Sequence, residues 1–385
     1  MRPEVELLLC CAPTHMNDDK LARFEQLLCG ALDWDFLQRF AGKHNLIPLL
    51  YHHLNARAPD KVPPIVDAKL RQQFRQISAW NAYLSGELRR LLTLFAAHNI
   101  DAIPYKGPAL AAHAYGNISL RPFRDLDILV RRRDVLRAKD LLIDEGFAPL
   151  PPLNEVQQAM MLRTQCNLPF TRDENRMVVE LHWQVAARLF SAPFDNESLW
   201  RRSGHASFAG MTIRTLAPED LLLSLCVHGV KHLWEKLSWI ADIAQLLVVE
   251  RDLNWRKLLE QARRTGTERM LLLSLYVTHE LLDAPLPEQV RETLRSDPEI
   301  ASLAGQIYSQ LFEETSYANG MSGYFLFQLK VRRRLRDKLN YCRYVVSPTE
   351  ADLTLLSLPA PLSFVYYFLR PLRMLWMGAP SHFQH

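Results

Sequence analysis

The sequence lacks several features that define whole classes of protein. Only 14 of its 385 residues are glycine, and no uncharged run approaches the roughly 18 apolar residues that a membrane-spanning helix needs. The apolar segment from Leu7 to Ala12 is short and follows Glu4 and Glu6, unlike a secretory signal with its basic start. The six cysteines form no C-x-x-C pair. We therefore expect reduced thiols in a cytoplasmic protein.

Charge of one sign is also in short supply. The 46 Lys and Arg residues nearly balance the 42 Asp and Glu residues, which leaves a formal charge of +4. This mild excess suits an acidic small ligand but does not indicate nucleic acid. The chain also has no aromatic-basic RNA-binding module, so an RNA-directed activity is the weakest hypothesis and nucleic acid is an unlikely partner.

Periodicity divides the chain into helical flanks and a mixed centre. Leucines at 84, 88, 91 and 92 recur at helical spacing, and scarce glycine favours helix generally. Short apolar segments near residues 102, 127, 168 and 180 read as strands. We predict an α+β protein, with a small mixed sheet between helical regions. The expected parts are an N-terminal helical region (1–98), a core (99–215), a C-terminal helical domain (216–345) and an aromatic, basic tail (346–385).

Two aspartates open one of these strands. Asp125 and Asp127 lie directly before the apolar residues 128–130. Residues i and i+2 of a strand share a face, so the two charges would conflict unless a cation lies between them or one acid is protonated. A solvated strand entrance, in which the acids pair with Arg121 and Arg124, is the alternative interpretation.

A third acid lies on a later predicted strand. Glu180 alternates with Val178 and His182, so these side chains share a face. Three strand-borne carboxylates can hold two Mg²⁺ ions. Glu180 could instead pair with an arginine, and His182 could be a core histidine, a group that orients a ligand, or a base on the acceptor side.

These motifs together resemble the nucleotidyltransferase superfamily of the DNA polymerase β type. The closer resemblance is to its bacterial branch, often called the uncharacterised nucleotidyltransferase family. It spans roughly residues 30 to 260, and the stretches that carry it are Lys106-Gly107, Arg121-Pro122, Asp125 to Val130, Glu180-Leu181-His182-Trp183, Trp34 to Tyr51 and His228 to Ile243.

The resemblance implies a polymerase β-like core and Mg²⁺-dependent (or Mn²⁺-dependent) transfer of a nucleoside monophosphate from a nucleoside triphosphate. Asp125, Asp127 and Glu180 would be the catalytic residues and the metal ligands, while Lys106 or Arg121 would offset phosphate charge. The acceptor would be a hydroxyl of an unidentified small molecule, peptide or protein. The alternative is a non-catalytic nucleotide-binding or scaffold protein of the same fold in a biosynthetic or surface-polysaccharide system.

The phosphate-binding turn departs from the family pattern. Lys106-Gly107-Pro108 stands where the superfamily has a Gly-Ser or Gly-Gly turn, and the gap to the acids is longer. Pro108 has no backbone N–H to offer a phosphate. Lys106 could supply charge instead, and the N-terminus of the following helix could supply backbone donors.

Two histidines on a later helix also have metal-ligand spacing. His228 and His232 are four residues apart, but no glutamate lies between them, so the zinc-protease motif is excluded. Lys231 between them would repel a cation. We expect Lys231 and His232 to face phosphate or ribose, with Asp242 paired to one of these basic groups; the alternative is that this helix only packs on the core.

The C-terminal part offers two further candidates. The basic run at residues 332–336 reads as a solvated helix face, or as a dock for an anionic acceptor or a membrane surface. The aromatic segment at residues 366–376 is expected to pack on the helical domain. Peripheral membrane contact through this tail is the alternative.

Overall fold

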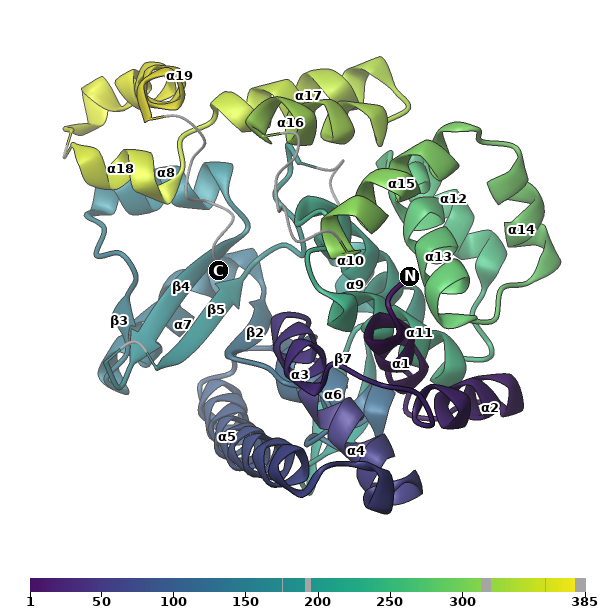
Figure 1. The fold of residues 1–385 in the computed structure, drawn as a ribbon. Helices are drawn as coiled ribbons and strands as arrows, with labels where there is room; N and C mark the ends of the chain where they lie inside the picture. The colour runs from purple at the N-terminus through teal and green to yellow at the C-terminus, as the bar shows by residue number, and fades with distance from the viewer. Residues whose placement is uncertain (175, 191–194, 313–319, 357, 378–385) are drawn as a thin grey trace.

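The computed structural model describes residues 1–174, 176–190, 195–312, 320–356 and 358–377. Helices flank a small mixed sheet, as predicted (Figure 1). The first part of the chain is helical throughout, which confirms that expectation. Its elements are α1 (Pro3–Cys11), α2 (Asp18–Leu27), α3 (Trp34–Lys43), α4 (Ile47–Arg57), the 3₁₀ helix η1 (Pro59–Lys61) and α5 (Pro64–Ala97).

The sheet has five strands in the order β1-β2-β5-β4-β3. Only the β2–β5 pair is parallel; the other pairs are antiparallel. The strands are β1 (Ala102–Pro104), β2 (Asp125–Val130), β3 (Ala148–Pro149), β4 (Asn167–Arg172) and β5 (Met177–His182). The connecting helices are α6 (Gly107–Tyr115), η2 (Arg132–Asp134), α7 (Val135–Asp144) and α8 (Glu155–Thr164). All four predicted strands are therefore present.

Some elements were not predicted from the sequence. The proline-rich stretch at 149–152 begins inside β3, where Pro149 pairs with Phe170. Proline is tolerated there because β3 is an edge strand and needs no inward N–H. A helix, α9 (Asn196–Arg202), and a β-hairpin follow the sheet. The hairpin strands are β6 (Gly204–Phe208) and β7 (Met211–Thr215), and β7 contacts β1. The polar residues of the hairpin weaken the strand signal in the sequence.

The rest of the described chain is helical. α10 begins at Pro218, with proline and two acids in its first turn. The elements are α10 (Pro218–Lys231), α11 (Leu237–Val249), α12 (Trp255–Thr265), α13 (Glu268–Leu282), α14 (Glu288–Arg295), α15 (Glu299–Phe312), α16 (Gly320–Lys330), α17 (Leu335–Val346), α18 (Glu350–Leu355), η3 (Ala360–Val365) and α19 (Tyr366–Met377).

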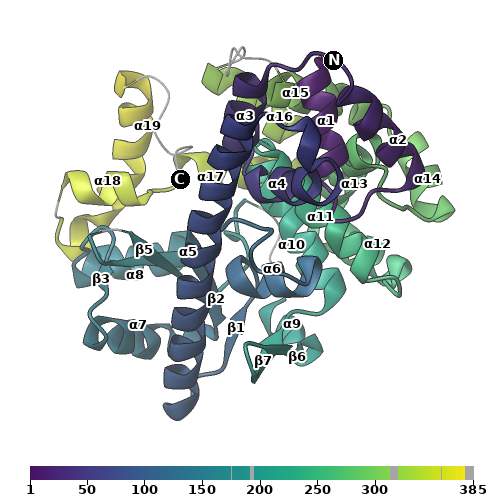
Figure 2. The same cartoon turned by 60° about the horizontal axis from the view of Figure 1, so that its bottom comes forward.

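Two hydrophobic clusters cover the two faces of β2. Leu126, Ile128 and Val130 pack in a cluster with the C-terminal half of α5 and with α7. Figure 2 shows α5 running past β1 and β2, which it contacts. Leu129 faces the other way, into a larger cluster that joins the first four helices to α10–α15. The acid-bearing face of the sheet therefore borders the helical part of the molecule. The division of the chain into four parts, made above from the sequence, stays a prediction.

The basic run was predicted wrongly. It is not a continuous helix face, because α16 ends at Lys330 and α17 begins at Leu335. Arg332 is 1% exposed, and its guanidinium donates to the carbonyls of Phe190 and Gln328. This arginine is a structural link between segments, since five donors in a fixed fork can satisfy several buried carbonyls at once.

The tail packs on the α/β core as well as on α17 and α18. Tyr366 is buried in the same cluster as β2 and β5, and Arg370 and Arg373 both bind the buried Asp352. Phe368 remains 64% exposed. Among the helices that the structure describes, none is both long and apolar enough to cross a bilayer. Peripheral membrane contact through this tail stays a prediction.

Candidate metal and nucleotide site

The parallel pairing of β2 and β5 brings the predicted acids together. Asp127 lies directly opposite Glu180 in the register. Side chains alternate on a strand, so Asp125 and Asp127 share a face of β2 while Glu180 and His182 share a face of β5. Four groups from two neighbouring strands therefore meet on the face that borders the helices.

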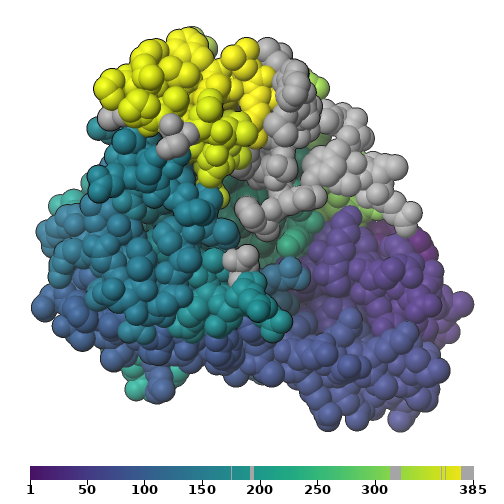
Figure 3. Space-filling model, turned by 90° about the vertical axis from the view of Figure 1, so that its left-hand side faces the viewer, coloured from purple at the N-terminus to yellow at the C-terminus, as the bar shows by residue number. Residues whose placement is uncertain are grey.

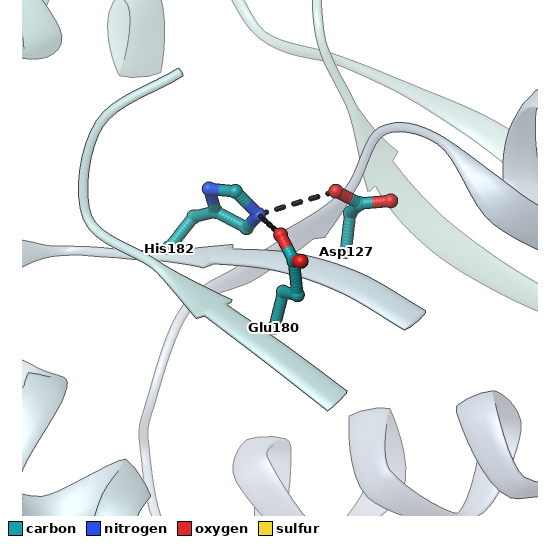
Figure 4. Close-up of side chains that lie close together, drawn as sticks. All are labelled: Asp127, Glu180 and His182. Atoms are coloured by element: carbon teal, nitrogen blue, oxygen red, sulfur yellow. Dashed lines mark hydrogen bonds and ion pairs between the residues drawn. The ribbon is translucent and has the colours of Figure 1, made fainter. Parts of the chain in front are cut away.

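The closest contacts centre on Asp127 (Figure 4). Lys106 Nζ donates to Asp127 Oδ1 at 2.9 Å, and His182 Nε2 lies 3.1 Å from the same oxygen. His182 Nε2 also lies 3.0 Å from Glu180 Oε2. One donor atom from each of Asp127, Glu180 and His182 lies within 4.8 Å of the others. Carboxylate oxygens and an imidazole nitrogen at this spacing are a suitable ligand set for a divalent cation.

Asp125 behaves differently from Asp127. Burial, and then the charges of Asp127 and Glu180, raise the pKa of Asp125 to about 7. Among the described residues, no hydrogen bond or ion pair within 4 Å holds its carboxylate. The charge conflict expected on this strand is therefore present, and without a metal a proton on Asp125 relieves it.

The neighbouring charges favour the ionised forms of the other groups. Although burial opposes charge, Lys106 and His182 hold the pKa of Asp127 below its usual value. His182 likewise lowers the pKa of Glu180 against the effect of burial. In return, burial lowers the pKa of His182, but hydrogen bonds to Asp127, Cys166 and Glu180 raise it well above its usual value overall. Without a metal, Lys106 and protonated His182 together supply the positive charge that buried carboxylates require.

Two further side chains contact the His182 ring. The Tyr105 hydroxyl lies 3.3 Å from His182 Nδ1 and 3.4 Å from Nε2, and the two rings meet edge to face. The Cys166 side chain also hydrogen-bonds the imidazole. Tyr105, Cys166 and His182 are all buried. The ring is therefore fixed with Nε2 toward the carboxylates.

Comparison with known proteins agrees with this geometry. A family model described as "Uncharacterised nucleotidyltransferase" matches residues 30–283, which is more than half of the chain. The chain belongs to the uncharacterised nucleotidyltransferase family. No curated protein and no solved structure matches the chain. The predicted resemblance to this family is thus confirmed, and the matched segment contains the sheet, α10 and α11.

The unusual turn before α6 in this family member is built around Gly107. Its φ is +50°, and a Cβ there would lie 3.0 Å from the Asp125 carbonyl oxygen. Glycine is needed at this position because it adopts positive φ without strain and permits this close approach. The turn therefore fixes Lys106 against the start of β2. Gly107 and Ala109 retain N–H groups in the first turn of α6, whereas Pro108 has none.

Arg121 lies in a buried network beside the acids. Its guanidinium donates to both carboxylate oxygens of Asp242, at 2.7 and 2.9 Å, and the Tyr115 hydroxyl donates to Asp242 at 2.8 Å. The expectation that Asp242 pairs with Lys231 or His232 was wrong, because Arg121 presents a planar fork that matches the carboxylate. Arg121 thus ties the loop before β2 to α11, and any role toward phosphate stays a prediction.

The end of α10 brings Lys231 toward the site. Burial lowers the pKa of Lys231, but Tyr344, Cys166 and Glu180 raise it above its usual value overall. His228, one turn earlier, is partly buried, and its burial followed by the charge of Lys106 lowers the pKa of that histidine. His232 packs against His228 and Trp239, with ring centroids 4.6 and 5.4 Å apart. Lys231 therefore feels the charge of Glu180, and His228 feels the charge of Lys106.

Several residues around the site were not predicted from the sequence. Asn167 on β4 donates to Glu180 Oε2 at 2.9 Å. Glu350, at the start of α18, has its pKa raised to about 7 by burial and by the charge of Glu180. Tyr105 and Cys166 complete the set. The apolar strand around Tyr105 was visible in the sequence, but nothing local to Cys166 or Glu350 indicates which distant segment they approach.

The molecular surface is hollowed between three groups of elements. Figure 3 shows this recess between the teal core, the yellow C-terminal helices and the purple N-terminal helices. α18 lies beside α8, where Gln157 Nε2 donates to the Leu353 carbonyl at 2.7 Å (Figure 1). The C-terminal segments are therefore attached to the core next to the strands that carry the acids.

Proposed function

We propose that this protein transfers a nucleoside monophosphate from a nucleoside triphosphate to an acceptor hydroxyl, with Mg²⁺ or Mn²⁺ as cofactor. The observation that carries the proposal is the convergence of Asp125, Asp127 and Glu180 on one face of neighbouring strands, beside the buried Lys106. Family membership and the metal-compatible donor set support it. The acceptor is a small molecule, a peptide or a protein, and cytoplasmic location is part of the proposal.

The ligand set fits a divalent cation. Asp125, Asp127 and Glu180 would hold it. The cation would stabilise the ionised form of Asp125 most, because this carboxylate has no ion pair among the described residues. When bound, the metal offsets the charge of the triphosphate and lowers the pKa of the acceptor hydroxyl. Lys106 and Lys231 are partly buried cations near these acids, suited to binding the phosphates.

The proposed reaction assigns a role to each of these residues. The acceptor oxygen forms a bond to the α-phosphorus while the bond from that phosphorus to the bridging oxygen of the β-phosphate breaks. Pyrophosphate leaves with that bridging oxygen, and the hydroxyl proton passes to Glu180. Lys106 and the Gly107 N–H would hold the leaving phosphates at the N-terminus of α6. In this proposal His232 contacts the phosphate or ribose of the nucleotide, and Arg121 offsets phosphate charge.

A thermal-shift experiment tests nucleotide binding at this site. Nucleoside triphosphates with Mg²⁺ or Mn²⁺ should raise the unfolding temperature of the wild type but not of the Asp125→Asn or Asp127→Asn variants. Asp140→Asn is the matched control, since Asp140 is exposed on α7 and should respond like the wild type. Equal shifts in all four proteins would remove the metal role of the two aspartates.

Transfer itself needs a second experiment. The protein is incubated with nucleoside triphosphates labelled at the α-phosphate and with fractionated cell extract. A labelled acceptor that requires Asp127 supports nucleotidyl transfer. Metal-dependent binding without any labelled product favours the alternative, a non-catalytic nucleotide-binding or scaffold protein. The turn supports this alternative because Pro108 has no N–H to donate to a phosphate.

A further inference from the structure

His182 occupies the position of a metal ligand rather than that of a distant supporting residue. Its Nε2 lies 3.0 Å from Glu180 Oε2 and 3.1 Å from Asp127 Oδ1. Neighbouring ligands of an octahedral ion with metal–ligand distances of about 2.1 Å lie about 3.0 Å apart. His182 Nε2 therefore already has this spacing to each of the two carboxylate oxygens, and all three donor atoms lie within 4.8 Å of one another.

The imidazole is also built into the fold as ligating histidines are. Tyr105 and Cys166 contact the ring, and His182 is 4% exposed. Polar partners behind a ligating histidine fix its tautomer and its orientation toward the metal. Rotation of the ring away from the carboxylates would break these buried contacts, so Nε2 stays directed at Asp127 and Glu180 (Figure 4).

A second observation points to a cation at this place. The Asp125 carboxylate is turned toward the same cluster without an ion pair among the described residues. Lys106 and His182 both bind the single oxygen Oδ1 of Asp127, so neither forms an ion pair with Asp125. One dication would satisfy more of these oxygens than the two monovalent groups do.

We propose that Asp127, Glu180 and His182 form a mixed oxygen–nitrogen metal site that binds Mn²⁺ more tightly than Mg²⁺. Mg²⁺ prefers carboxylates, phosphates and water and is a poor partner for imidazole. First-row transition ions accept an imidazole nitrogen readily, and Mn²⁺ also suits carboxylates and an octahedral arrangement. The inference rests on the proposed function only in taking this cluster as the place of the cofactor.

Electron paramagnetic resonance of Mn²⁺ added to the full-length protein tests the ligand set without any nucleotide. We expect one bound Mn²⁺ per chain, with hyperfine modulation from an imidazole nitrogen. Roughly tenfold or greater excess of Mg²⁺ should be needed to displace it. Bound Mn²⁺ without nitrogen modulation, or displacement by Mg²⁺ at equal concentration, would overturn the proposal.

The variant His182→Asn checks the assignment. It should lose the nitrogen modulation and bind Mn²⁺ roughly 10–100-fold more weakly, with a smaller effect on Mg²⁺. His113→Asn is the matched control, because His113 pairs with Glu250 on the outer side of α6. Retained modulation in His182→Asn overturns the proposal, and the wild-type spectrum decides it if that variant does not fold.

The outcome separates this inference from the proposed function. Mn²⁺ bound by oxygen ligands alone removes the role of His182 but leaves the nucleotidyltransferase proposal intact. No metal binding with or without nucleoside triphosphate removes both. Nitrogen-ligated Mn²⁺ with no nucleotide binding supports the site and removes the proposed reaction.

Discussion

Lys106 is the residue that makes the metal-free cluster tolerable. Its ammonium is 15% exposed and lies 2.9 Å from an Asp127 carboxylate that is 2% exposed. A buried ion pair is a weak source of stability in itself, yet loss of one partner leaves an uncompensated charge in a poorly solvated place. The same ammonium would have to give way, or turn to phosphate, when a metal binds.

Lys106→Met should therefore destabilise the metal-free protein by about 3–5 kcal/mol. It should also enlarge the stabilisation that Mn²⁺ gives, because the metal no longer competes with the ammonium for Asp127. Chemical denaturation with and without Mn²⁺ measures both effects. Lys257→Met, at an exposed position on α12, is the control and should change neither. An unchanged metal-free stability of Lys106→Met would contradict this description of the cluster.

Gly107 gives a second prediction at the residue scale. Gly107→Ala should cost about 1–2 kcal/mol from its positive φ alone, and the 3.0 Å approach to the Asp125 carbonyl should add to that. Gly86→Ala is the matched control: nothing lies within 4 Å of a Cβ there, and the residue is exposed inside α5. It should stabilise by roughly 0.5–1 kcal/mol. The two variants should shift the denaturation midpoint in opposite directions from the wild type. Equal shifts would show that the turn at Gly107 accommodates a Cβ.

Among the elements, the loop before β2 is held from two sides. Asn81 on α5 donates to the carbonyls of Ile118 and Arg121, at 2.6 and 2.9 Å. Asp242 on α11 binds the Arg121 guanidinium. Two helices distant in sequence therefore set where β2 begins, and with it the position of Asp125.

Asp242→Asn should cost about 3–5 kcal/mol, because it leaves the Arg121 charge buried without a counter-charge. A double-mutant cycle with Arg121→Met should give a large coupling energy, since the two residues lose the same interaction. Asp67→Asn is the surface control: it breaks the exposed pair with Arg71 and should cost at most about 0.5 kcal/mol. A coupling energy near zero would contradict the description of this link.

The sequence predicted the strands and the acids because both signals are local. Strand alternation alone places Asp125 with Asp127 and Glu180 with His182, and the family resemblance connects the two pairs. The Arg121–Asp242 pair could not be predicted, because its partners are 121 residues apart and each lies in an ordinary amphipathic context. The hairpin β6–β7 was missed for another reason: Ser207 pairs with Thr212 and His205 with Arg214, so its outer face is polar.

Across the whole molecule, the N-terminal helices are joined to the later helices through one hydrophobic cluster. His44, just after α3, is part of that junction. The Leu237 N–H donates to His44 Nδ1 at 3.2 Å, so this nitrogen must be unprotonated. Burial, and then the charge of Lys43, lowers the pKa of His44 to about 3.

This shift predicts a stability loss in acid. The unfolded chain binds a proton at His44 near pH 6.5 and the folded chain only near pH 3, so this stability is present above pH 6.5 and lost as the pH falls toward 3. Between pH 7 and pH 5, His44 should lower the free energy of unfolding by about 2 kcal/mol. His44→Gln keeps an acceptor without the titration, so its free energy of unfolding should fall less over this interval. Parallel pH profiles of the two proteins would contradict the assignment.

The central claim is that the acids on β2 and β5 hold a divalent metal ion through which a nucleoside triphosphate binds. Isothermal titration calorimetry of a nucleoside triphosphate into the full-length protein tests it most directly, with Mn²⁺ or with a chelator, for the wild type and Asp127→Asn. We predict one binding site in the wild type that requires metal, and a loss of at least about tenfold in affinity in the variant. Equal affinity in both proteins, or binding that persists in the chelator, would contradict the claim.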